Sequence, residues 1–332
     1  MKFGIMLPNS GPLAQVESIK QVARQAEGLG FDSVWIHDHI TYDRDWFIHR
    51  MSGLIEQTES GLEPDFYESL MTLTYVAGIT ERVKLGTGIL VLPLRNPLVL
   101  GRQAMTMQAL CKGRLLLGVG LGDYLHEFDV MNVPYQDRAP ITNEYLEILT
   151  RIFAGGEVSY EGKTIRFRKA SFLPRVSSIP LLIGGGTILS PEPKEDHLSL
   201  PVLRRVAKWG HGWLPEGSPR LIEMGVKKIQ ELAKEYGREN IDFEIAAFLP
   251  LYIADDELAT RKTARSMETE FFSVRKGMEI SLIGSPSTIV KKLEEYRDAG
   301  TTTMVIRCWA ESLDSFLDMM HIFATEIAPS FG

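Results

Sequence analysis

Apolar runs of strand length alternate with amphipathic stretches of helix length along this chain, and the alternation predicts its fold. A strand is expected at 3–7, a helix at 13–28 and a second strand at 31–36. A strand, a helix and a strand at this spacing form a right-handed parallel unit. The chain therefore begins as a parallel α/β protein.

The same alternation continues to the C-terminus. Eight strand–helix units in this order favour a closed (β/α)8 barrel over an open sheet. A length of 332 residues suits one barrel with insertions, since such barrels commonly reach roughly 250 residues or more. The further strands are expected at 83–93, 113–120, 180–186, 210–214, 243–253 and 301–307, and the further helices at 68–80, 96–110, 141–153, 201–208, 221–236, 257–272, 287–299 and 312–327.

Three segments interrupt the alternation, and we interpret them as insertions into a single domain spanning 1–332. Residues 41–64 have mixed polarity and no clean period, as expected of a long βα loop or lid. Residues 154–173 predict a hairpin-like excursion, and 187–200 predict a second long loop, rich in proline and charge. We expect 41–64 and 187–200 to shape a substrate pocket, but their sequences do not identify the substrate.

Composition and charge exclude several classes of function. Hydrophobic residues make up 44% of the chain and charged residues 24%, as in a soluble globular protein. A formal net charge of −7 without a Lys/Arg cluster argues against binding to nucleic acid or to an anionic membrane. No run approaches the ~20 apolar residues of a membrane span, and the first apolar run is too short for a signal peptide. We therefore expect a cytoplasmic protein.

The two cysteines give no sign of a metal site. Cys111 and Cys308 lie far apart, and neither belongs to a Cys-x-x-Cys pair or a Cys/His cluster. We expect both to be buried thiols in a reducing compartment, and no metal ligands are predicted.

Candidate chemistry gathers after two of the predicted strands, at the end of a parallel sheet that carries the ligand. His39, preceded by Asp38, follows the second strand and is a candidate catalytic base or donor, with a structural histidine as the alternative. Asp123 follows the fourth strand and can exchange a proton if burial raises its pKa; the alternative is a solvated loop acid.

Glycine-rich turns mark the ends of two more strands. Gly184, Gly185 and Gly186 can present backbone N–H groups to a phosphate, with the Thr187 hydroxyl beside them, although an ordinary tight turn is the alternative. The series at 118, 120 and 122 is no dinucleotide fingerprint, because Asp123 replaces its third glycine and no helix is predicted to open there. Glycines inside the third strand indicate a bulge or a close approach to a bound molecule.

Other residues have ordinary interpretations. The tryptophans at 35, 209, 213 and 309 are expected in the core or in a pocket wall. Arg307 ends the eighth strand, where it meets either an anionic ligand group or a structural ion-pair partner.

Taken in order and spacing, several segments resemble the bacterial luciferase-like superfamily of flavin- and deazaflavin-dependent oxidoreductases. The resemblance implies a (β/α)8 barrel that holds a flat tricyclic ring at its C-terminal mouth, with the cofactor phosphate on backbone amides of later loops. The segments that carry it are Ala26–His39, Thr80–Gly88, Gly113–Gly120, Ile183–Gly186, Gly210–Trp213 and Gly284–Pro286.

The resemblance also implies roles for single residues. Gly88 and Ile89 are expected behind the ring, where the family often has a bulge with a non-prolyl cis peptide. An Asp–His pair like Asp38–His39 is also shown by deazaflavin-dependent relatives, so Asp38 is a candidate cofactor-binding residue. FMN-using members often carry tryptophan after Gly-x-Gly, whereas deazaflavin-using members often carry Asp or Glu, so Asp123 favours coenzyme F420. Glu127, with the aromatic residue after it, is similar to a family pair that holds a loop.

The leading hypothesis is an oxidoreductase that transfers hydride between a small organic substrate and bound F420, with His39 and Asp123 handling a proton. An FMN-dependent monooxygenase that uses reduced flavin and O2 is the alternative, and a non-catalytic flavin-binding protein is a third hypothesis. The titratable groups at the mouth argue against the third. Relatives commonly dimerise through barrel helices, so a homodimer is one of the assemblies left open.

Overall fold

Eight parallel strands close into a ring in the computed structural model, which describes residues 1–41, 65–187, 194–254 and 281–332. The strand β10 pairs with both β9 and β12, and β12 pairs in turn with β1, so the sheet has no break. This confirms the predicted (β/α)8 barrel. The eight strands are β1 (Lys2–Met6), β2 (Ser33–Ile36), β3 (Lys84–Thr87), β5 (Leu115–Gly120), β8 (Leu181–Gly184), β9 (Gly212–Leu214), β10 (Glu244–Ile253) and β12 (Thr303–Cys308).

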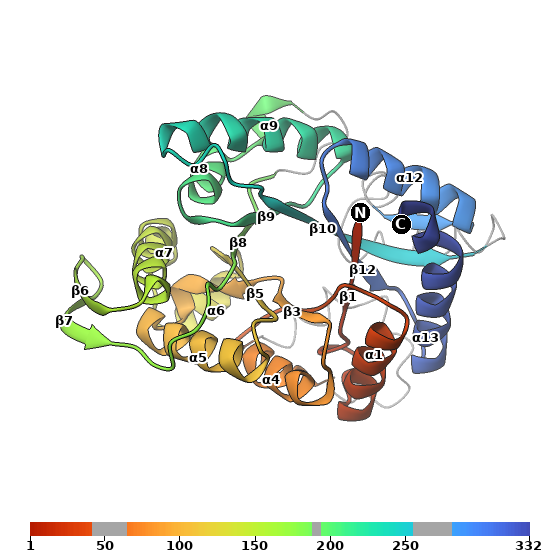
Figure 1. Cartoon of the computed structure of the whole chain (residues 1–332), viewed down its shortest axis with the longest axis horizontal. Coiled ribbons are helices and arrows are strands. Elements are labelled where there is room, and N and C mark those ends of the chain that lie inside the picture. Colours follow the sequence, from red (N-terminus) through yellow and green to blue (C-terminus); the bar gives the residue numbers. More distant parts are fainter. Residues whose placement is uncertain (42–64, 188–193, 255–280) are drawn as a thin grey trace.

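Helices surround the strands on the outside of the ring (Figure 1). Each predicted helix that lies in the described ranges is present, whereas the helix expected at 257–272 lies outside them. These helices are α1 (Val16–Gly28), α4 (Ser69–Ile79), α5 (Pro97–Leu110), α7 (Arg138–Ala154), α8 (Leu200–Trp209), α9 (Pro219–Glu235), α12 (Pro286–Asp298) and α13 (Leu313–Ile322). The helix predicted at 312–327 continues past α13 as a π-helical turn at Phe323–Ile327.

β11 (Leu282–Gly284), which adds to β10 outside the ring, was not predicted, because three residues are too few for a hydrophobic period to be visible in the sequence. The strand predicted at 83–93 is divided into two parts, β3 and β4 (Leu90–Val91), and both parts pair with β5.

The insertion at 154–173 is the expected antiparallel hairpin. Its strands β6 (Glu157–Glu161) and β7 (Arg166–Ser171) stand beside α7, away from the ring (Figure 1). The Glu144 carboxylate on α7 accepts hydrogen bonds from three successive backbone N–H groups of the hairpin, at 163, 164 and 165. The insertion predicted at 41–64 lies outside the described residues except for position 41, and the one at 187–200 is described except for 188–193. In the second insertion, Thr187 forms a β-bridge with Leu198.

The inside of the barrel is organised around Trp35. This side chain is fully buried among apolar residues of β1, β8, β9, β10 and β12, whereas its neighbours Val34 and Ile36 face the helices. The flanking strands have glycine opposite the indole ring: a Cβ at Gly86 would lie 2.3 Å from Trp35 Cε3, and one at Gly4 would lie 2.7 Å from Trp35 Nε1. The close approach predicted at the glycines of the third strand is therefore, at Gly86, an approach to Trp35.

The described residues also bear on the cysteines, on membrane-spanning helices and on metal sites. Cys111 and Cys308 are both buried free thiols, as predicted. Among the helices that the structure describes, none is long and apolar enough to cross a membrane, and within the same ranges no three His, Cys, Asp or Glu side chains gather as a metal site would require.

We expect Gly86→Ala to lower the free energy of unfolding by about 1–3 kcal/mol, because the added methyl group overpacks the barrel against Trp35. Urea unfolding followed by circular dichroism would measure the change. Gly78→Ala in α4 is the matched control, since a Cβ there meets nothing within 4 Å. In a helix interior this change should leave stability equal or raise it by up to about 1 kcal/mol. Equal stability of Gly86→Ala and Gly78→Ala would contradict the packing argument.

Candidate active site

The C-terminal ends of β1, β2 and β12 surround a pocket at the barrel mouth. His37 from the end of β2 and Arg307 from β12 line it, together with apolar groups that include Pro8 and Trp309. Trp309 was expected either in the core or in a pocket wall, and it forms part of this pocket wall. Arg307 lies in the lining of this pocket, and its contact with an anionic ligand group stays a prediction.

A non-prolyl cis peptide joins Gly88 and Ile89 between β3 and β4, as the family resemblance implied. The half-buried Ile89 side chain lies over the ends of β5 and β8. A Cβ at Gly120 would lie 2.9 Å from Ile89 Cδ1, and one at Gly184 would lie 2.5 Å from Ile89 Cγ2. The glycines that end these two strands therefore make room for Ile89 at the centre of the mouth.

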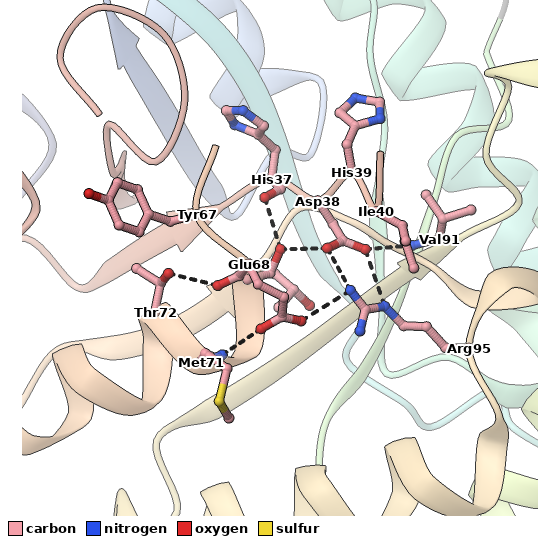
Figure 2. Close-up of polar contacts among 12 residues, drawn as sticks. His37, Asp38, His39, Ile40, Tyr67, Glu68, Met71, Thr72, Val91 and Arg95 are labelled. Carbon is pink, nitrogen blue, oxygen red and sulfur yellow. Dashed lines mark hydrogen bonds and ion pairs between the residues drawn. The ribbon is translucent and has the colours of Figure 1, made fainter. Parts of the chain in front are cut away.

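Asp38 is held inside the protein by a network of charged and polar groups (Figure 2). Its carboxylate accepts hydrogen bonds from Arg95, at 2.7 Å from Nη2 and 3.2 Å from Nε, and from Ser69 Oγ at 2.7 Å. Arg95 also forms an ion pair with Glu68 at 3.2 Å, and the Asp38 side chain is 0% exposed. Both carboxylate oxygens are used by the protein, so a direct bond from this carboxylate to a cofactor stays a prediction that requires the ion pair to open.

The two histidines beside Asp38 turn away from Arg95 (Figure 2). Ser10 Oγ lies 2.7 Å from His37 Nε2, and the carbonyl oxygen of His37 accepts hydrogen bonds from Asn9 Nδ2 and Ser69 Oγ. The end of β2 is thus fixed through its backbone as well as through Asp38. Both imidazoles are left on one side of the strand end.

His39 contacts Glu127, which lies on a short helix, α6 (Leu125–Val130). The Glu127 carboxylate is 1% exposed, and its Oε2 lies 3.0 Å from His39 Nδ1. Its Oε1 accepts hydrogen bonds from the backbone N–H groups of Ile40 and Thr41. The predicted role of Glu127 in holding a loop is therefore confirmed, and the contact with His39 is new.

Asp123 lies between β5 and α6, and its side chain is exposed. The burial on which a proton-exchange role for this carboxyl group was conditional is therefore absent, and its exposure agrees with the alternative of a solvated loop acid. The structure also corrects the expectation that no helix opens after the glycine series, because α6 begins at Leu125. Six residues are too few to show a helical period in the sequence. The rejection of a dinucleotide-binding fold still holds, because the parallel sheet is a closed barrel.

The turn after β8 has the backbone conformation that only glycine adopts easily. Gly185 and Gly186 have φ of 88° and 97°. The N–H of Gly185 donates to the carbonyl of Leu214 at 3.1 Å, and the carbonyl of Gly185 accepts from Trp213 Nε1 at 2.7 Å. A Cβ on Gly185 would meet nothing within 4 Å, so open space lies over the turn. Phosphate binding by Gly184, Gly185, Gly186 and Thr187 stays a prediction.

Arg95 and the contact between Glu127 and His39 are the parts of the site that sequence reasoning missed. Arg95 precedes Asn96, which caps the N-terminus of α5, and an arginine there looks like an ordinary surface charge. Its partner Asp38 lies 57 positions earlier. Glu127 had a signal, since the family pattern marked it, but its partner lies 88 positions away.

Comparisons with known proteins agree with this fold. Residues 1–279 match the luciferase-like monooxygenase family. The chain is 27% identical to the 5,10-methylenetetrahydromethanopterin reductase of Methanopyrus kandleri, in a 363-residue alignment that covers 92% of each protein.

Two solved structures share the fold at lower identity. An F420-dependent secondary alcohol dehydrogenase in complex with an F420–acetone adduct superposes with a TM-score of 0.79 at 17% identity, covering 100% of this chain and 99% of that one. The oxygenating constituent of 3,6-diketocamphane monooxygenase from Pseudomonas putida, in complex with FMN, gives 0.73 at 16% identity, covering 99% and 98%. Because the family match extends over most of the sequence, this chain belongs to the luciferase-like monooxygenase family.

Proposed function

We propose that this protein is an oxidoreductase that transfers a hydride between a small organic substrate and bound coenzyme F420. The observation that carries the proposal is Asp123, placed after the glycine-rich end of β5, where FMN-using members of the family often have tryptophan. The reductase of M. kandleri and the F420-dependent alcohol dehydrogenase are the relatives that support it.

The residues at the mouth fit a flat ring with a phosphate-bearing tail. Ile89 offers half-buried apolar surface at the centre of the mouth, and the open space over Gly185 leaves room for the tail. The deazaflavin ring supplies the carbon that accepts or gives the hydride. Ile89 supports the ring, while His39 and Asp123 exchange a proton with the substrate at its edge.

An FMN-dependent monooxygenase is the second candidate, and the FMN-bound camphane monooxygenase is the observation in its favour. The same mouth would hold the flavin. The protein's task would then be to exclude water from the reduced ring while O2 reacts. For either cofactor we place the protein in the cytoplasm, where a reducing environment keeps Cys111 and Cys308 as thiols.

We expect purified protein to bind F420 saturably, seen as a change in the absorbance and fluorescence of the cofactor during titration. A parallel titration with FMN is the comparison. Both rings are flat and tricyclic, but FMN-using members of the family often have tryptophan at the position of Asp123. Saturable FMN binding with no response to F420 would overturn the proposed cofactor and favour the monooxygenase.

We expect His39→Ala and Asp123→Asn each to lower turnover by roughly 10²-fold to 10⁴-fold, the range of a lost proton-transfer group. The dissociation constant of F420 should change much less, because neither side chain carries the ring or its tail. Asp129→Asn is the matched control for Asp123, since Asp129 is an exposed acid on α6. Steady-state kinetics with F420 would measure all three. Wild-type turnover in both mouth variants would remove these residues from the mechanism.

We propose that the protein forms a homodimer through α4 and α5. α4 has no charged residue, and α5 has one, Arg102. Exposed apolar side chains on these helices include Met71, which is 63% exposed, with Tyr75 and Val99. A helix that is apolar on all sides is normally buried on all sides. A second copy of the same surface would cover these side chains without any need for complementary charge.

We expect light scattering to give a mass near twice 37.3 kDa for the wild type. Tyr75→Glu should shift the protein to the monomer, because a charge in an apolar interface is desolvated without a partner. Val16→Lys is the control, since Val16 is an exposed apolar residue on α1. A wild-type mass of 37.3 kDa, or a dimer that survives Tyr75→Glu, would contradict the proposed interface.

A further inference from the structure

The buried carboxylate of Glu127 reaches the mouth of the barrel from α6 and contacts the imidazole of His39 there. Its Oε2 lies 3.0 Å from Nδ1 of that ring. The imidazole is also in edge-to-face contact with Phe66, at 5.6 Å between ring centroids, and with Tyr124, at 6.3 Å. The contact at Nδ1 and the two aromatic rings therefore help to fix the orientation of the imidazole.

The hydrogen-bond pattern around Glu127 favours a hydrogen on Nδ1 of His39. Oε1 accepts from the backbone N–H groups of Ile40 and Thr41, so the carboxyl group already serves two donors. An ionised carboxylate can only accept, and therefore a ring nitrogen that faces it must carry a hydrogen. With the hydrogen on Nδ1, the neutral imidazole has its lone pair on Nε2.

Two other carboxylates that the structure describes near this strand end bind Arg95. Asp38, the adjacent residue, turns its carboxylate to Arg95 on the opposite side of the strand end (Figure 2). Glu68 also binds Arg95. Glu127, by contrast, contacts the His39 ring directly.

We propose that Glu127 is a positioning residue that holds His39 as the Nδ1–H tautomer, so that any proton exchanged with a ligand passes through Nε2. The inference rests on the proposed function only for its catalytic consequence, because the tautomer is a property of the protein itself. α6 follows directly after Asp123, so one short segment places both groups that handle the proton.

The test is the tautomer of His39 in the cofactor-free protein, read from the 15N and 1H resonances of histidine rings. His39→Gln identifies the His39 signals by their loss. We expect the wild-type ring to carry its hydrogen on Nδ1 in a single state. In Glu127→Gln the amide has one oxygen for three donors, so we expect a mixture of tautomers or the Nε2–H form.

Kinetics with F420 gives the second readout. Glu127→Gln should lower kcat by up to the roughly 10²-fold to 10⁴-fold that a positioned proton-transfer group contributes, with KM much less affected. Glu144→Gln is the matched control, because Glu144 also accepts several backbone N–H groups but contacts the hairpin turn. It should match the wild type in kcat and in the His39 signals.

The outcomes separate this inference from the proposed function. A wild-type ring with its hydrogen on Nε2 overturns the inference without any variant, even if Glu127→Gln fails to fold. Unchanged His39 tautomer in a folded Glu127→Gln protein also overturns it, whatever the kinetics. Absence of F420 binding and turnover in the wild type overturns the proposed function instead, and an Nδ1–H ring that responds to Glu127→Gln then still supports the positioning role.

Discussion

The buried ion pair between Asp38 and Arg95 is the interaction on which the geometry of the barrel mouth depends. A buried carboxylate is costly unless it is paired and hydrogen-bonded, and removal of one partner from such a pair typically costs about 3–5 kcal/mol. Arg95 and Ser69 meet this need from the starts of α5 and α4, so the end of β2 is tied to both helices. Neighbouring residues of extended backbone point to opposite sides. Burying Asp38 therefore turns His37 and His39 to the other side, as Figure 2 shows.

Three glutamate carboxylates stabilise connecting segments of the barrel by accepting hydrogen bonds from successive backbone N–H groups. Glu27 binds the N–H groups of residues 81–83, Glu127 those of 40 and 41, and Glu144 those of 163–165. Each pins a connecting segment to a helix, at a place where no strand or helix would satisfy those donors. Glu127 differs from the other two because one of its oxygens also faces an imidazole. At the mouth, Glu127 thus both holds a connecting segment and contacts the candidate catalytic residue His39.

Glycines leave room for a series of large side chains that extends from the barrel interior to the mouth. Gly4 and Gly86 give room to Trp35, whose ring meets Phe248 edge-on at 5.3 Å. Phe248 in turn lies next to Gly88, where a Cβ would come within 2.6 Å of its ring. Above them Ile89 occupies the space left by Gly120 and Gly184. The glycines that resemble ligand turns in the sequence thus accommodate a column of large side chains that ends at the surface proposed for the ring.

The sequence by itself determined the eight strands, their order, most helices and the hairpin, because hydrophobic periods of two and 3.6 residues are local properties of the chain. It also placed His39 and Asp123 at strand ends. Elements of three to six residues, such as β11 and α6, were missed because they are too short to show a hydrophobic period. The partners of the site residues were decided only by the tertiary structure. Closure of the barrel brings Asp38 to Arg95 and His39 to Glu127 across 57 and 88 positions, and no local pattern encodes which strand ends meet.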